Sequence, residues 1–127
     1  MQQKRYLANI FKNVPAPLAQ VEHYGLTEYI QRFAPAGFPV HVAIHAIAGI
    51  KTCNETDYSA PHVHLDRNEI NLLISNGELV YAITLGEETH EVAAPATIWI
   101  PAGLRHASNV RTGEGFFVCI QFDRHTP

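Results

Sequence analysis

From residue 40 onward, apolar and polar positions alternate in short segments separated by turn residues. Residues 40–47 alternate with a period of two, and the pattern ends before Gly49. Comparable segments follow at 70–74, 78–85, 89–93, 96–100, 106–110 and 115–123. Because successive side chains of a strand point to opposite faces, this period is typical of β-strands. Strands at such short intervals predict an all-β sandwich or barrel.

One connection carries a specific turn signal. The dipeptide Asn76-Gly77 separates the segment ending at Ile74 from the one that begins at Glu78. These two residue types favour the positive backbone dihedrals of a tight hairpin turn. We therefore expect a hairpin there.

The first 39 residues differ from the rest of the chain, because four prolines divide them into short pieces. One short helix is expected over residues 28–33, with Thr27 as its cap and Pro35 as its stop. We interpret residues 1–39 as an N-terminal arm that packs on the barrel or on a partner subunit, and residues 40–127 as the barrel. A loosely ordered lead-in is the alternative.

Composition limits the function classes. The chain has 127 residues, of which 46% are hydrophobic and 17% charged, as expected of one domain with one core. A net charge of -3 without a basic stripe argues against nucleic acid and against a membrane surface as partners. The first residues lead into no long apolar run, so a cytoplasmic location is expected. Cys53 and Cys119 lack redox spacing, and Cys119 fits a small buried position.

The segment from Pro61 to Glu69 carries the first chemical signal. His62 and His64 would share one face of an extended segment, and Glu69 could reach the same point from beyond a bend. Imidazole and carboxylate ligands together suit first-row divalent metals. For the histidines the alternative is a surface or hydrogen-bonded pair, and for Glu69 a solvated turn carboxylate.

A second signal follows the expected strand 96–100. Pro101, Gly103 and His106 form a Pro-x-Gly-x-x-His arrangement. Proline and glycine at this offset favour a tight turn, after which the chain can re-enter as a strand with His106 directed inward. This would supply a third imidazole.

Together these two segments resemble the motifs of the cupin family. The first cupin motif runs Gly, five residues, His-x-His, three or four residues, Glu, six residues, Gly; His62, His64 and Glu69 match it. Thr56 stands where the leading glycine is usual, and Gly77 comes one residue late.

The second cupin motif runs Gly, five residues, Pro-x-Gly, two residues, His, three residues, Asn. Pro101, Gly103 and His106 match it. Pro95 replaces the first glycine, and Asn109 comes one residue early. The resemblance extends from about residue 40 to residue 123.

The resemblance implies a double-stranded β-helix, or jelly-roll, barrel with one divalent metal ion held by His62, His64, Glu69 and His106. Iron, manganese, nickel, zinc and copper are all compatible. A six-coordinate ion with these ligands keeps two open positions for a small-molecule substrate, whereas tetrahedral zinc would be closed. The resemblance also implies a homodimer, with the N-terminal arm as the contact.

Other residues are candidates for lining the barrel. We expect substrate contacts from side chains near the metal, namely Arg105, Tyr81, Trp99 and Gln121, with Arg67 as an alternative anion-binding arginine. One of His41 and His45 could line the barrel mouth, although a core histidine is the other interpretation. His23, His90 and His125 are interpreted as surface residues.

Two functional hypotheses follow. The first is a metal-dependent enzyme for an oxygen-rich small molecule, with an Fe(II)-type dioxygenase favoured over an isomerase, epimerase or lyase acting on a sugar or hydroxy-acid. The second is a non-catalytic module that binds a small molecule or a metal.

Overall fold

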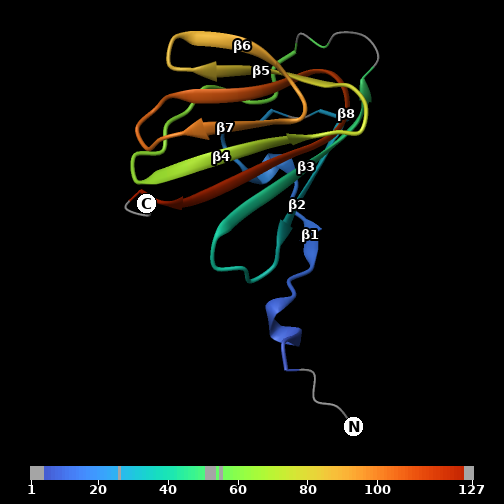
Figure 1. The fold of residues 1–127 in the computed structure, drawn as a ribbon, viewed down its shortest axis with the longest axis vertical. Helices are drawn as coiled ribbons and strands as arrows, with labels where there is room; N and C mark the ends of the chain where they lie inside the picture. The colour runs from blue at the N-terminus through green and yellow to red at the C-terminus, as the bar shows by residue number, and fades with distance from the viewer. Residues whose placement is uncertain (1–4, 26, 51–53, 55, 125–127) are drawn as a thin grey trace.

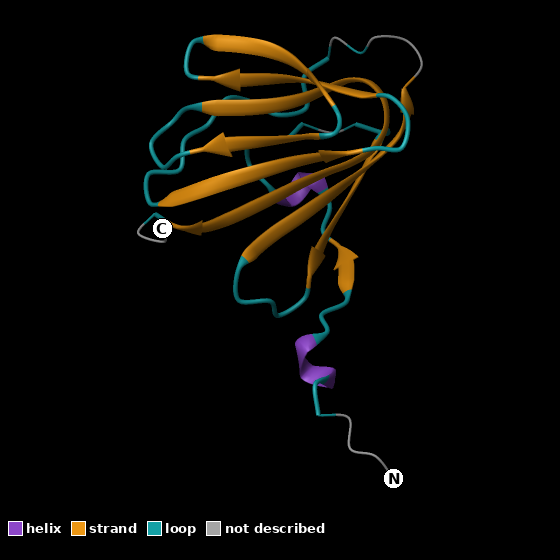
Figure 2. Cartoon of the chain, viewed as in Figure 1, coloured by secondary structure: helices purple, strands orange, loops and turns teal. Residues whose placement is uncertain are grey.

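The computed structural model describes residues 5–25, 27–50, 54 and 56–124 (Figure 1). Strands dominate this part of the chain (Figure 2). The strands are β1 (Asn13–Pro15), β2 (Ile30–Pro35), β3 (His41–Ile50), β4 (Arg67–Ile74), β5 (Leu79–Leu85), β6 (Glu88–Ala93), β7 (Ala96–Ile100) and β8 (His106–Asp123). Two short 3-10 helices, η1 (Leu7–Asn9) and η2 (Leu18–Gln20), precede β2.

All eight strands form one hydrogen-bonded antiparallel sheet, which the long strand β8 divides into two faces, each called a sheet. Its first half pairs with β5, which also pairs with β6. Its second half lies between β3 and β4, and this sheet continues to β1 and β2 on one side and to β7 on the other. The aromatic rings of Tyr81 on β5 and Phe117 on β8 stack across the interior with centroids 5.1 Å apart. The result is the jelly-roll barrel expected from the sequence.

Two glycines let β8 pass from one sheet to the other. Gly113 and Gly115 have positive φ angles of 97° and 145°. A Cβ atom on Gly113 would collide with the backbone carbonyl of Glu78, and one on Gly115 with that of Ile74. The β4–β5 connection therefore runs against the backbone of β8, and only glycine fits at these contacts.

Inward-facing apolar residues of both sheets form the core. On β3 and on the second half of β8 the buried positions alternate, as the period-two pattern predicts, whereas residues 106–110 of β8 are all buried. The largest fully buried apolar side chains are Tyr81, Leu73, Leu79, Ile83, Ile100 and Val110.

Three local expectations are wrong. Residues 28–33 form no helix, because Ile30–Pro35 is strand β2, paired with β3; Thr27 Oγ1 accepts a hydrogen bond from Tyr29 N within a turn. Asn76-Gly77 makes no hairpin with positive φ angles, because β4 and β5 do not pair with each other and instead pair with opposite halves of β8. The segments expected at 106–110 and 115–123 are one continuous strand.

The expected boundary between arm and barrel, at residues 39 and 40, lies in the connection between the paired strands β2 and β3. Leu18 and Ile30, from before this boundary, belong to the core cluster. Residues 5–12 lead away from the barrel (Figure 1). Within the described ranges, no helix has the length and apolarity needed to cross a membrane.

Candidate metal centre

Backbone hydrogen bonds hold the two histidine segments side by side. His62 and His106 exchange a pair of N–H to carbonyl bonds, both 2.9 Å long, and Gly103 N donates to His64 O at 2.8 Å. Gly103 has a φ of 90°, a conformation that favours glycine and that turns the chain from β7 toward β8. Residues more than forty positions apart in sequence thus present their imidazoles to one point.

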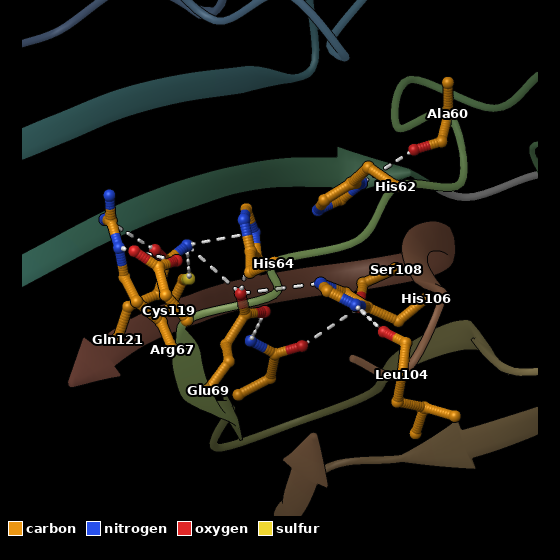
Figure 3. A network of polar contacts seen from close by, with 12 residues as sticks. Ala60, His62, His64, Arg67, Glu69, Leu104, His106, Ser108, Cys119 and Gln121 are labelled. Atoms are coloured by element: carbon orange, nitrogen blue, oxygen red, sulfur yellow. Dashed lines mark hydrogen bonds and ion pairs between the residues drawn. The ribbon is translucent and has the colours of Figure 1, made fainter. Parts of the chain in front are cut away.

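The orientation of two rings is fixed by backbone carbonyls (Figure 3). His62 Nδ1 donates to Ala60 O at 2.8 Å, and His106 Nδ1 donates to Leu104 O at 2.9 Å. Because a carbonyl only accepts, Nδ1 carries the proton in both rings and Nε2 keeps a free lone pair. Potential ligand atoms of His62, His64 and His106 all lie within 4.8 Å of one another.

The three-histidine cluster fits a divalent metal ion. His106 is 2% exposed, and its Nε2 finds no hydrogen-bond partner in the described part of the chain. A buried nitrogen without a partner is costly, and a metal ion would satisfy it. Backbone partners on the opposite ring nitrogens are the usual support of metal-binding histidines.

Glu69 reaches the cluster from β4. The strand register places His41, Gln121 and Glu69 in one row across β3, β8 and β4. Glu69 Oε1 lies 3.5 Å from the Nε2 atoms of both His64 and His106. Ligand atoms about 2.1 Å from a shared tetrahedral ion are about 3.4 Å apart, so Glu69 Oε1 has a suitable position for a fourth ligand.

Hydrogen bonds support this carboxylate. Glu69 Oε2 accepts from Asn71 Nδ2 at 2.7 Å, and Oε1 accepts from Gln121 Nε2 at 3.1 Å. Burial favours the neutral acid, but the nearby His106 imidazole and the hydrogen bond from Asn71 outweigh it and lower the pKa of Glu69 to about 2. The carboxylate is therefore ionised at neutral pH.

The imidazoles differ in protonation. Burial lowers the pKa of His62 and of His64, which keeps both rings neutral at pH 7. Burial also disfavours the charged form of His106, yet the nearby carboxylate of Glu69 and the hydrogen bond to Leu104 O raise its pKa. A metal ion would therefore compete with a proton for His106 Nε2.

The cluster opens into a cavity of about 200 Å³. Its lining includes residues that the sequence did not place there, among them His23, Tyr24 and Arg32. His23, which was interpreted as a surface residue, stacks on His62 with ring centroids 3.6 Å apart. Burial and the neighbouring His62 lower the pKa of His23 to about 4, so it is neutral at pH 7.

Comparison with known proteins adds to this picture. No protein-family model and no curated protein sequence matches the chain. Solved structures do match. KdgF from a Halomonas species has a TM-score of 0.57 at 13% identity, covering 84% of this chain and 92% of its own. An RmlC-like cupin from Shewanella frigidimarina has a TM-score of 0.54 at 10% identity, and the match covers 98% of this chain and 95% of that cupin. The chain has the cupin fold.

A third similar structure is a predicted oxalate decarboxylase from Thermotoga maritima, with a TM-score of 0.56 at 12% identity over 91% of this chain and 95% of that one. At such identities the likeness concerns the fold alone. The expectation of a cupin barrel is thereby confirmed, and the histidine cluster lies inside this barrel.

Of the four residues expected to contact substrate, only Gln121 lines the cupin cavity. Trp99 is 51% exposed and packs on Phe122 at the outer surface, so it cannot reach the metal cluster. Tyr81 is fully buried in the core, and its hydroxyl is hydrogen-bonded to that of Tyr58. Arg105 is exposed next to the turn and does not line the cavity.

The remaining histidines and Asn109 are also placed. His41 lines the cavity, whereas His45 is a core residue whose Nδ1 is 3.0 Å from Tyr58 Oη. His90 is exposed, and His125 lies outside the described residues. Asn109 Oδ1 accepts from the backbone N–H groups of Tyr58 and Ser59, both at 2.8 Å, and so anchors the segment that leads to His62.

Proposed function

We propose that this chain is a metal-dependent enzyme acting on a small oxygen-rich molecule, with the ion held by His62, His64, His106 and Glu69. The observation that carries this proposal is the pair of Nδ1 atoms fixed by backbone carbonyls, which aims two Nε2 lone pairs at one point. A bound divalent ion would supply a Lewis acid with positions for substrate oxygen atoms.

The site itself supports a small substrate. A cavity of about 200 Å³ is below the range of about 300–1,000 Å³ typical of drug-sized ligands. It corresponds to about seven water molecules in the liquid. Gln121, whose Nε2 donates to Glu69 Oε1 and lies 3.3 Å from His64 Nε2, places a side-chain amide on the cavity lining beside the proposed ligands.

Among reaction classes, we favour an Fe(II)-type dioxygenase, because three imidazoles and one carboxylate with neighbouring open positions suit iron. The competing class is isomerase, epimerase, lyase or decarboxylase chemistry. It is favoured by the neutral imidazoles of His23 and His41 in the same cavity, since such reactions need groups that move protons. The fold likeness to a predicted oxalate decarboxylase is compatible with this second class.

The metal centre is tested by titrating the metal-free protein with Zn²⁺ and Fe²⁺ and measuring the dissociation constant. His106→Ala should weaken binding by more than the 10- to 100-fold typical of losing an outer hydrogen-bond partner. His90→Ala is the matched control, because His90 is exposed and outside the cavity. Equal affinity of the wild-type and His106→Ala proteins would refute the proposed centre.

The reaction class is tested separately. Iron-loaded protein should consume dioxygen with a panel of diketones and hydroxy-acids, and His106→Ala should not. Turnover of a hydroxy-acid or sugar without oxygen consumption would instead assign the isomerase or lyase class. Metal binding without turnover of any compound would favour the non-catalytic binding module.

A further inference from the structure

Two arginines face the metal cavity, and one carboxylate, that of Glu69, lies among its lining residues. Arg32 is on β2 and Arg67 is on β4, so they approach from strands that are not adjacent. A divalent ion would add positive charge to this cavity. The lining therefore carries more positive than negative charge, which favours an anionic ligand.

Arg32 lacks a partner for most of its guanidinium. Its NH1 donates to Ala16 O at 3.2 Å, and its guanidinium carbon lies 6.0 Å from the centre of the Tyr24 ring. Its Nε is buried and has no hydrogen-bond partner, and no carboxylate of the described ranges forms an ion pair with it. A half-buried cation without a counter-ion is unfavourable, and a bound anion would relieve this cost.

Arg67 is poised beside the metal ligands. Its NH1 donates to Gln121 Oε1 at 3.1 Å, and Gln121 Nε2 donates to Glu69 Oε1 at 3.1 Å. Its ion pair with Asp66 is long, at 3.9 Å, and both side chains are at least half exposed, so this pair neutralises little of its charge. The side chain of Gln121 thus links the guanidinium of Arg67 to the proposed ligand Glu69.

The two positive charges act on the same part of the cavity. His41, opposite Gln121 in the strand register, lies within the influence of both. Its pKa is lowered by burial first, and then by the charges of Arg32 and Arg67. The ring of His41 is therefore neutral, and the cations that surround it are the arginines.

We propose that Arg32 and Arg67 form an anion subsite that binds the carboxylate of the substrate, so that the substrate is a small 2-hydroxy or 2-oxo acid rather than a neutral sugar. This inference rests on the proposed function for the metal that takes the neighbouring oxygen atom. Arginine suits the task, because its planar group of donors matches the two oxygens of a carboxylate. The cavity of about 200 Å³ suits a small acid.

The test compares lactate with lactamide, its neutral analogue, by calorimetric titration of zinc-loaded protein. Lactate should bind at least 10-fold more tightly than lactamide. Arg67→Met should weaken lactate binding by about 10- to 100-fold, the value of a lost charged hydrogen bond, and should weaken lactamide binding much less. Arg5→Met removes an exposed charge far from the cavity and should change neither.

Arg32 needs a paired design, because its side chain also packs on Tyr24. Arg32→Lys keeps the positive charge and should retain part of the lactate affinity. Arg32→Met removes the charge and should lose the lactate affinity while the thermal stability stays unchanged. If Arg32→Met fails to fold, the half-exposed Arg67 carries the test alone. Inorganic phosphate is the competing anion, and tighter binding of phosphate than of lactate would overturn the carboxylate assignment.

The two proposals fail in different ways. In His106→Ala protein without metal, weak lactate binding that is still sensitive to Arg67→Met would support the subsite even if the metal centre proved wrong. Equal lactate binding by wild-type, Arg32→Met and Arg67→Met proteins, all with zinc bound, would overturn the subsite and leave the metal centre standing.

Discussion

His45 shows how a single buried side chain can couple the stability of this barrel to pH. Its ring is fully buried on β3, with Nδ1 3.0 Å from Tyr58 Oη, and its Nε2 has no hydrogen-bond partner in the described segments. Tyr24 and Phe117 pack against the ring. Burial first, and then the charges of Arg32 and His23, lower the pKa of His45 to about 3.

The unfolding free energy of the metal-free protein should therefore fall as the pH is lowered below 6.5. Between about pH 4 and 6 the unfolded chain binds a proton on His45 and the folded chain does not, which contributes about 1.4 kcal/mol per pH unit. His45→Gln should lose this part of the slope in urea unfolding measured across the range.

Other histidines with lowered pKa values, such as His23, contribute to the pH dependence of stability with the same sign in the wild-type and the His45→Gln proteins. The difference in slope between these two proteins therefore isolates the contribution of His45. Identical slopes for the wild-type and His45→Gln proteins would show that His45 is charged in the folded state.

Some residues of the candidate site could be predicted from their spacing in the sequence, and others could not. Same-face spacing indicated His62 and His64 as a possible pair, and the match of both segments to the cupin motifs joined them with Glu69 and His106. His23 and Arg32 were missed because long-range pairing brings them to the cavity. Tyr24 bridges to Ser59, and Arg32 pairs with His45. No local pattern encodes such pairings.

Among the elements, the path of β8 depends on the positive φ angles of Gly113 and Gly115. Replacing Gly113 by alanine would force a positive φ on a residue with a Cβ and bring that Cβ against Glu78 O. We expect Gly113→Ala to lower the free energy of unfolding by about 3 kcal/mol or more.

Two other glycines separate these contributions. Gly103→Ala should cost about 1–2 kcal/mol, because its φ is positive but no atom lies within 4 Å of the added Cβ. Gly77→Ala should be nearly neutral, because the φ of Gly77 is not positive and the space around it is open. Urea unfolding measures the free energy of unfolding of the three variants. Equal stabilities of the Gly113→Ala and Gly77→Ala proteins would contradict the close contact described between β8 and Glu78.

The elements were predictable where alternation alone decides the structure. Strands β3 to β7 lie within a few residues of the expected ranges, and burial alternates along much of β3, β4 and β7. The segment 28–33 was misassigned because Ile30 and Phe33 satisfy a helical spacing as well as a strand, and pairing with β3 selects the strand. The two expected final strands are one, because glycines that usually end a strand here permit its crossing between sheets.

For the whole molecule, the N-terminal segment leaves an apolar surface without a partner in the described chain. Tyr6, Leu7 and Ile10 are 61–74% exposed. A groove of about 400 Å³ is lined by apolar residues such as Pro15, Leu18 and Phe33, together with polar residues that include Arg32. Three large apolar side chains exposed within five residues of one segment are typical of an interaction site.

We propose that the chain is a homodimer in which residues 5–12 of one subunit pack on the other. Leu7→Glu combined with Ile10→Glu should convert the dimer to a monomer, because two carboxylates would be buried without partners. Light scattering of the eluting protein measures the mass.

Leu65→Glu is the control, because Leu65 is equally exposed, at 72%, but lies beside His64 and away from the N-terminal segment. A wild-type monomer at micromolar concentration would refute the dimer. A dimer that survives the double substitution and is lost in Leu65→Glu would move the interface to the cavity mouth, where a partner subunit would limit access of the substrate to the metal.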